Sequence, residues 1–117
     1  MKYTTEDRKV QIRGEASGVQ GEMKVEILFP QQPNARLFAN VWLEPGASLD
    51  YHEHHGECEI YYILEGEGAY QDNENVYQVV AGDVTVCDSG NGHAMKNTGK
   101  QPLRWVALIY SSKSPIG

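Results

Sequence analysis

The sequence predicts an all-β protein that folds as a sandwich or a barrel. Apolar and polar residues alternate in ten short runs, and a period of two is the pattern of a half-buried strand. Clusters of Gly, Pro, Asn and Asp separate these runs and supply the backbone conformations that tight turns need. No window has the period of an amphipathic helix. Short strands at such spacing are typical of sandwiches and barrels.

The expected strands follow one another closely along the chain. In order they are residues 10–13, 24–29, 36–44, 48–52, 57–64, 68–71, 76–80, 84–87, 93–96 and 103–110. Turns are expected at 45–46, 72–75, 81–83, 88–92 and 97–99. Residues 14–22 contain three glycines and no period, so they form either a flexible flap or a loop that links the first two strands. The tail 111–117 is expected to fray.

Length and charge limit the class of protein. A chain of 117 residues makes one domain. Ten basic and 16 acidic residues give a formal net charge of −6 without basic clusters, which argues against a nucleic-acid partner. Residues 1–9 are polar and unlike a signal peptide, and no apolar run approaches the ~20 residues of a membrane span. We therefore expect a cytoplasmic protein without membrane contact.

Two cysteines and several aromatic residues bear on the interior and on assembly. Cys58 and Cys87 are too few for a disulfide framework and are expected to be small buried hydrophobes, with a single bridge as the alternative. Trp42, Tyr62 and Trp105 belong either in the core or at a contact with a second subunit. A short chain with exposed sheet edges favours a homodimer, formed by strand exchange or sheet packing.

Three of the four histidines lie close together, at 52, 54 and 55. His52 and His54 are two residues apart, so on a strand both imidazoles point to one face. Glu59 follows a glycine-containing turn, and a returning strand would bring its carboxylate beside them. His93 joins them only if the later strands fold back across the sheet. Three imidazoles and one carboxylate suit Mn²⁺, Fe²⁺, Co²⁺, Ni²⁺ or Zn²⁺ and leave two octahedral positions open.

Each of these residues also has an ordinary interpretation. A single histidine in a sheet is usually a hydrogen-bond partner, but three at these spacings with Glu59 favour metal ligation. A carboxylate on the inner face costs several kcal/mol to bury without a cation, and a metal ion removes that cost. His55 lies on the opposite face from His54 by strand parity, so we expect it to be solvated or to support a ligand.

Two sequence motifs resemble those of the cupins. The first, G-x5-H-x-H-x4-E-x6-G, is met by Gly46, His52, His54, Glu59 and Gly66. The second, G-x5-P-x-G-x2-H-x3-N, is met by Gly82, Gly90, His93 and Asn97, with Asp88 in place of the proline. Residues 44–68 look most like the small single-domain cupins that are similar to oxalate decarboxylase.

This resemblance implies a jelly-roll barrel, or double-stranded β-helix, of six to eight strands in one domain spanning 1–117. Its barrel core would cover about 36–110, after N-terminal strands and a loop at 1–35. The metal, with Mn²⁺ favoured, would be held by His52, His54, Glu59 and His93. The aspartate at position 88 changes the stiffness of a turn and leaves the ligand set intact.

Strand parity extends the prediction to the wall of the cavity. Leu49, Tyr61, Ile63 and Met95 share faces with the expected ligands and should line it. Tyr61 is the candidate catalytic residue, as a proton donor or an orienting group, with packing as its alternative role. Arg36 and Arg104 are the cations on strands that could clamp an anionic substrate, with exposure to solvent as the alternative.

Three functions remain open. The leading hypothesis is a metal-dependent enzyme that acts on a small carboxylate, or on a hydroxy or keto acid, by decarboxylation, isomerisation or lyase chemistry. The sequence has no evident general base and no lid carrying a glutamate, which oxalate decarboxylation would require. The alternatives are an Fe²⁺-dependent dioxygenase and a non-catalytic protein that binds a small ligand through its metal.

Overall fold

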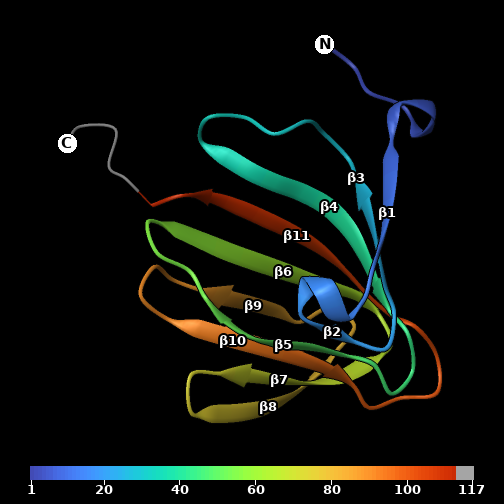
Figure 1. Ribbon diagram of the computed structural model, residues 1–117, viewed down its shortest axis with the longest axis vertical. Coiled ribbons are helices and arrows are strands. Elements are labelled where there is room, and N and C mark those ends of the chain that lie inside the picture. The colour runs from blue at the N-terminus through green and yellow to red at the C-terminus, as the bar shows by residue number, and fades with distance from the viewer. Residues whose placement is uncertain (113–117) are drawn as a thin grey trace.

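The computed structural model describes residues 1–112 and confirms the all-β prediction. These residues form eleven strands and two short 3₁₀ helices, and Figure 1 shows how the strands are arranged. In chain order they are η1 Thr5–Asp7, β1 Lys9–Arg13, η2 Glu15–Ser17, β2 Val19–Gln20, β3 Met23–Ile27, β4 Ala35–Leu43, β5 Ser48–Glu53, β6 Glu57–Glu65, β7 Glu67–Asp72, β8 Asn75–Val80, β9 Val84–Cys87, β10 Gly92–Asn97 and β11 Leu103–Ser111. Each of the ten predicted strands is present, and β2 is an addition.

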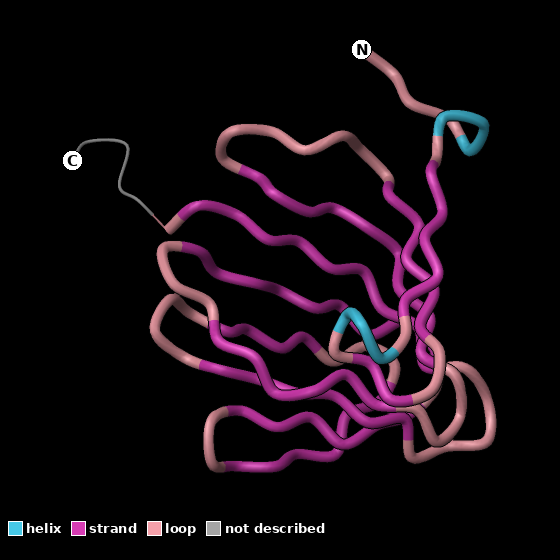
Figure 2. Tube along the Cα trace, viewed as in Figure 1, coloured by secondary structure: helices cyan, strands magenta, loops and turns pink. Residues whose placement is uncertain are grey.

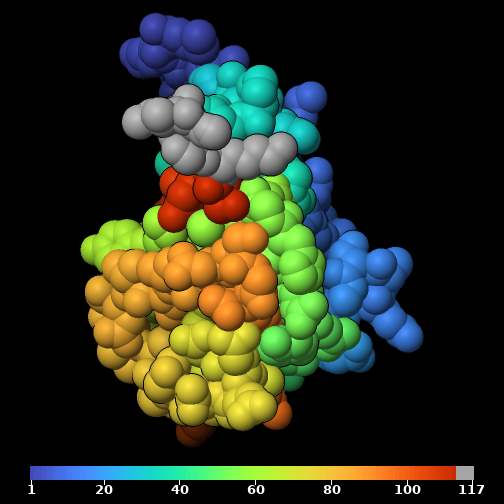
Figure 3. Space-filling model, turned by 90° about the vertical axis from the view of Figure 1, so that its left-hand side faces the viewer, coloured from blue at the N-terminus to red at the C-terminus, as the bar shows by residue number. Residues whose placement is uncertain are grey.

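The strands form two antiparallel sheets that face each other (Figures 1 and 2). One has six strands in the order β1-β3-β4-β11-β6-β9, and the other has five in the order β2-β5-β10-β7-β8. The fold is a jelly roll in which the two sheets stay separate and do not close into one continuous barrel. In the side view of Figure 3 the N-terminal residues, dark blue, stand at the top, away from the body formed by the orange and yellow strands.

The core lies between the sheets because every long strand buries alternate residues. Along β11 the buried positions are Leu103, Trp105, Ala107 and Ile109. Trp105 is only 1% exposed and belongs to the core, whereas Tyr62 on β6 is 48% exposed on the outer face. Trp42 is half-buried on that same outer face, beneath Lys24 and Arg104.

The stretch 14–22 is a fixed loop and not a detached flap. It contains η2 and β2, and β2 pairs with β5. Val19 is fully buried, and the Asp50 amide donates to the Gly18 carbonyl at 2.8 Å. The loop is therefore held in place both by backbone hydrogen bonds to the five-stranded sheet and by the buried side chain of Val19.

Two other predictions concern the tail and the cysteines. Fraying was expected from residue 111, but Ser111 ends β11 and the Ser112 amide donates to the Gly56 carbonyl at 3.1 Å; residues 113–117 lie outside the described chain.

Cys58 and Cys87 are free and buried, as predicted, and no bridge joins them. Burial raises the pKa of the Cys87 thiol to about 11, so it stays protonated. Among residues 1–112 no helix has the length and apolar character to cross a membrane.

The motif glycines occupy turns that need a left-handed backbone. Gly46, Gly66, Gly82 and Gly90 have φ of 78°, 85°, 96° and 90°. A Cβ on Gly66 would also lie 2.8 Å from the Pro102 carbonyl oxygen and 3.0 Å from the Leu103 Cα, whereas a Cβ on Gly46 would meet nothing within 4 Å. Glycine is thus required at position 66 for its left-handed backbone and for the lack of space for a Cβ, and at position 46 for its left-handed backbone alone.

This difference predicts unequal losses of stability. We expect Gly46→Ala to lower the free energy of unfolding by about 1–2 kcal/mol, the usual cost of a left-handed residue with a Cβ. Gly66→Ala should cost more, because the atoms it meets are backbone and cannot rotate away. Urea denaturation of both variants measures the two losses, and equal losses would show that the contact at Pro102 does not matter.

Candidate metal centre

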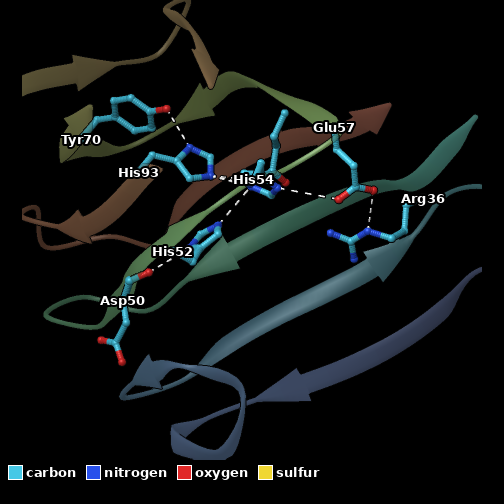
Figure 4. Close-up of polar contacts among 8 residues, drawn as sticks. Arg36, Asp50, His52, His54, Glu57, Tyr70 and His93 are labelled. Carbon is cyan, nitrogen blue, oxygen red and sulfur yellow. Dashed lines mark hydrogen bonds and ion pairs between the residues drawn. The ribbon is translucent and has the colours of Figure 1, made fainter. Parts of the chain in front are cut away.

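Elements from both sheets bring four potential ligands together. His52 on β5 and His93 on β10 are direct partners in the register of the five-stranded sheet. His54 follows the end of β5, where its amide donates to the Asn91 carbonyl at 3.1 Å. Glu59 comes from β6 in the six-stranded sheet. Figure 4 shows the three imidazoles turned toward one another between the strands.

The donor atoms are spaced like the corners of a metal polyhedron. Glu59 Oε1 lies 2.9 Å from His93 Nε2, 3.0 Å from His54 Nε2 and 3.8 Å from His52 Nε2. The Nε2 atoms of His54 and His93 are 3.1 Å apart. Adjacent ligands of an octahedral ion with bonds of about 2.1 Å are about 3.0 Å apart. The His/His/His/Glu group is therefore positioned to bind one metal ion.

Outer contacts orient the imidazoles so that Nε2 faces the centre. His52 Nδ1 lies 2.9 Å from the Asp50 carbonyl oxygen, which only accepts, so Nδ1 carries the proton and Nε2 keeps its lone pair. His93 Nδ1 lies 2.7 Å from the Tyr70 hydroxyl. Glu57 Oε1 is 4.0 Å from His54 Nδ1. These partners hold each ring in the orientation that a metal ligand needs.

Burial and hydrogen bonds act in opposite directions on Glu59. The side chain is 4% exposed, and burial alone would raise the pKa of its carboxyl. Hydrogen bonds with His52, His54 and His93 outweigh the burial and hold that pKa well below its usual range. Burial lowers the pKa of His93, whereas the pKa of His52 is raised, because its bonds to Glu59 and Asp50 outweigh its own burial. Glu59 is thus ionised and His93 neutral, as a metal requires.

Metal affinity should fall as the pH falls. Protons compete with the ion for the imidazoles, and the raised pKa of His52 means that this competition starts at a higher pH than usual. Glu59 stays ionised throughout and adds nothing to the effect. Below the pKa of His52 we expect about a tenfold loss of affinity per pH unit for each proton displaced. Calorimetric titrations of Mn²⁺ between pH 5 and 8 test this, and an affinity independent of pH would contradict it.

A cavity of about 270 Å³ opens beside these donors. Three of the four donors, His52, His54 and Glu59, line it. Apolar side chains from the six-stranded sheet form much of the remainder, namely Met23, Val25, Leu37, Val41, Trp105 and Ile109. A metal ion at the four donors would therefore face a largely apolar space with room for a small molecule.

The structure separates the predicted wall residues into two groups. Leu49 and Tyr61 line the cavity, as expected. The prediction is wrong for Ile63 and Met95, which are buried in the core and do not reach it. Parity placed both on the inner face correctly, but each lies farther along its strand than the ligands. The ring of Tyr61 stacks on His93 at 5.0 Å between centroids, and burial raises the pKa of its hydroxyl well above the usual value.

A β-bulge places Arg36 at the cavity. The register of β4 with β11 shifts between Ile109, which faces Leu37, and Tyr110, which faces Ala35. Arg36 is the extra residue, so it turns toward the inner side and its Nε donates to Glu57 Oε2 at 2.8 Å. In Figure 4 its guanidinium extends toward the side where the histidines lie. Arg36 lines the cavity.

The two remaining predicted polar residues lie away from the centre. Arg104 is on the outer face of β11, where it stacks over Trp42 and bonds to Glu65, so it is not a substrate clamp. His55 is exposed, its Nε2 lies 3.3 Å from Glu53 Oε1, and it is not among the four grouped donors. Its predicted place on the surface is confirmed.

Sequence reasoning missed Tyr70, Glu57 and Arg13. Tyr70 reaches His93 because β7 pairs with β10, and no local pattern reveals that pairing. Glu57 bridges Arg36 and His54, and it could have been noticed as the inner-face neighbour of Glu59 two residues earlier. Arg13 lines the cavity from β1, a strand far from the histidines in sequence.

Comparisons with known proteins agree with this architecture. The model of the cupin domain matches residues 40–109. An oxalate-binding protein of Thermotoga maritima is 44% identical over 95 residues, which are 79% of this chain and 78% of that protein. The crystal structure of a predicted oxalate decarboxylase from the same organism superposes with a TM-score of 0.88 at 38% identity, covering 95% of this chain and 99% of the other. The cupin domain of Schizosaccharomyces pombe Cnp3 shares the fold, with a TM-score of 0.74 at 19% identity over 87% of this chain and 69% of the other. The chain belongs to the cupin family.

Proposed function

We propose that the chain binds one divalent metal ion through His52, His54, Glu59 and His93 and acts on a small organic acid. Mn²⁺ is the favoured ion, because an ionised carboxylate among imidazoles in octahedral spacing suits a harder cation. Fe²⁺, Ni²⁺, Co²⁺ and Zn²⁺ are the alternatives for the same donors. Elemental analysis of protein purified without added metal identifies the ion.

One observation supports an organic acid more than any other. Three of the four metal donors, His52, His54 and Glu59, line the same cavity as Arg36. Arg36 Nε donates to Glu57, whereas Nη1 and Nη2 donate no hydrogen bond to any of residues 1–112. A carboxylate with one oxygen on the metal can accept from these donors. The Thermotoga relative is named an oxalate-binding protein, which agrees with this class of ligand.

The residues around the ion would have separate tasks. A bound divalent ion supplies Lewis-acid chemistry that stabilises negative charge on a substrate oxygen. Arg36 fixes the carboxylate, and the apolar wall excludes water. Tyr61 keeps its proton because burial raises its pKa, which favours a hydroxyl that orients the substrate by donating a hydrogen bond and makes full transfer of that proton harder. Decarboxylation, isomerisation and lyase reactions are all within reach of this arrangement.

The carboxylates around the cavity bear on whether the protein is catalytic. Among its lining residues the carboxylates are Glu59, which faces the metal position, and Asp50, whose Oδ2 accepts from Gln20 at 3.3 Å. Glu59 would be held by the metal, which leaves the exposed Asp50 as the one carboxylate of the lining that could act as a general base. Without a part for Asp50 the arrangement favours reactions that need no base, or ligand binding without turnover. An Fe²⁺-dependent dioxygenase remains the third candidate, and spectra of the purified metal with oxygen uptake would identify it.

Arg36→Gln tests the ligand class against a matched control. With the Mn²⁺-loaded protein we expect the variant to bind oxalate about tenfold to a hundredfold more weakly, because a charged hydrogen bond of about 1.5–3 kcal/mol is lost. Arg104→Gln, on the outer face, should bind as the parent does. Calorimetry with a panel of organic acids measures both affinity and class. If no acid in the panel binds the loaded protein, the proposed ligand class is wrong.

A homodimer is also proposed, through the outer face of the six-stranded sheet. One row of side chains, in direct register across all six strands, runs Val10, Glu26, Asn40, Val106, Tyr62, Val84. Large exposed apolar side chains gather on this face, namely Val10, Ile12, Phe38, Tyr62, Val84 and Val86. The face also carries Lys24, Arg104, Glu26 and Glu65, so a copy related by a two-fold axis can meet opposite charges.

Sedimentation of two tyrosine variants tests this dimer. Tyr62 and Tyr77 are both 48% exposed, but Tyr77 is on β8 at the far edge of the other sheet. Tyr62→Lys should give a monomer and Tyr77→Lys should leave the dimer intact. A parent protein that stays monomeric at high concentration would refute the assembly.

The two free cysteines agree with a reducing compartment, and we propose a cytoplasmic protein on that ground.

A further inference from the structure

Arg13 brings a second positive charge to the cavity wall. It ends β1 on the inner face, opposite Met23. Its Nε and Nη2 both donate to the neutral oxygen Gln11 Oε1, at 3.2 and 2.8 Å. The other arginines, Arg8, Arg36 and Arg104, pair with Glu26, Glu57 and Glu65. Within residues 1–112 no carboxylate oxygen lies within 4.0 Å of Arg13, so its charge is not neutralised by the protein.

Arg13 and the metal donors approach the cavity from different positions along the sheet. The register places Arg13 opposite Met23, which faces Leu43, and places Glu59 opposite Ile109, which faces Leu37. Leu37 and Leu43 are six residues apart on β4, about 20 Å at 3.3 Å per residue. The Arg13 guanidinium bonds to Gln11, which is in register with Val25 and Val41, so the side chain folds back over part of that distance to line the same cavity. The two charged regions are therefore separated along the length of the cavity.

Apolar residues occupy the wall between these two regions. Val25 and Val41 are in register on β3 and β4 and both line the cavity, as does Trp105. The cavity has a volume of about 270 Å³. Oxalate has six heavy atoms, and even if each took the roughly 30 Å³ of a water molecule in the liquid, oxalate would fill at most about 180 Å³. The cavity is therefore larger than oxalate. The space suits a ligand with a short apolar middle.

We infer that Arg13 forms a second anion subsite, and that the ligand is an aliphatic organic acid with a second carboxylate at its far end. One carboxylate, with or without an adjacent hydroxyl or keto oxygen, lies at the metal and Arg36, and the far carboxylate pairs with Arg13. The chain between them contacts Val25 and Val41. This inference rests on the proposed function of the metal site and adds the length and charge of its ligand.

Calorimetry on the full chain loaded with Mn²⁺ tests this subsite. The ligands are the straight dicarboxylates from two to eight carbons and the monocarboxylates of the same lengths. We expect at least one dicarboxylate of four or more carbons to bind tenfold or more tightly than its matched monocarboxylate. Arg13→Gln should remove that preference and leave the affinities for oxalate and for the monocarboxylates unchanged. Arg8→Gln, whose arginine pairs with Glu26, is the matched control and should keep the preference.

The outcomes separate this inference from the function on which it depends. If the loaded parent protein binds no carboxylate of any length, the proposed ligand class fails. If it binds mono- and dicarboxylates of each length equally, or if Arg13→Gln keeps the preference, the second subsite does not exist although the metal site stands. The comparison of ligands in the parent protein decides the question even if the Arg13 variant does not fold.

Discussion

Replacing His54 by alanine is expected to abolish stoichiometric metal binding, whereas replacing His55 leaves it intact. His54 Nε2 lies within 3.1 Å of both Glu59 Oε1 and His93 Nε2, so its loss removes one of four converging donors. It also leaves the buried Glu59 with one hydrogen-bond partner fewer. His55 is exposed and its one polar contact within the described chain is with its neighbour Glu53, so the same change there removes no donor.

The size of the loss follows from the coordination. Removing a residue that merely supports a ligand costs about 10–100-fold in metal affinity, and removing a ligand costs more. Elemental analysis after dialysis, with calorimetry for the residual affinity, measures the loss in both variants. Two equal losses would mean that the wrong face of the β5–β6 turn has been assigned to the metal.

Metal loading is expected to stabilise the fold strongly. The ion would bind donors from both sheets, among them His52 on β5 and His93 on β10 on one side and Glu59 on β6 on the other, and the unfolded chain has no such site. At a free ion concentration of 1,000 times Kd the gain is about 4 kcal/mol. For a domain of this size such a gain raises Tm on the order of 10 °C. Thermal melts with Mn²⁺ and with a chelator give the difference.

Glu59→Gln shows whether that stabilisation comes from the four-donor site. The variant keeps the size of the side chain but removes the negative charge, so the added metal should give little or no rise in Tm. Glu57→Gln, which alters only the group between Arg36 and His54, should keep most of the rise. A parent protein whose Tm is the same with Mn²⁺ and with chelator would show that the ion does not join the two sheets.

The local part of the site was predictable because His52, His54 and Glu59 are close in sequence. The expected hairpin between their strands was wrong, because β6 does not pair with β5 but crosses to the facing sheet, and Glu59 meets the histidines across the gap between the two sheets. His93 is different, since only the pairing of β10 with β5 brings it there, and the second motif was needed to infer it. The ten predicted strands follow from alternation and turn residues, whereas β2, with two residues, is too short to show any period.

The rest of the site depends on features that no local pattern reveals. Parity puts Arg36 on the outer face, and the register shift opposite Ile109 and Tyr110 reverses it. Arg13 and Tyr70 reach the cavity and His93 through strand pairings far apart in sequence. Ile63 shows the opposite error, because a correct face does not say how far along the strand the cavity extends.

The anomalous scattering of a crystal grown with Mn²⁺ tests the central claim most directly. We expect a single strong peak between the two sheets, about 2.0–2.3 Å from the Nε2 atoms of His52, His54 and His93 and from a Glu59 carboxylate oxygen. A map with no peak among these four side chains, or with its peak at another place, would contradict the account.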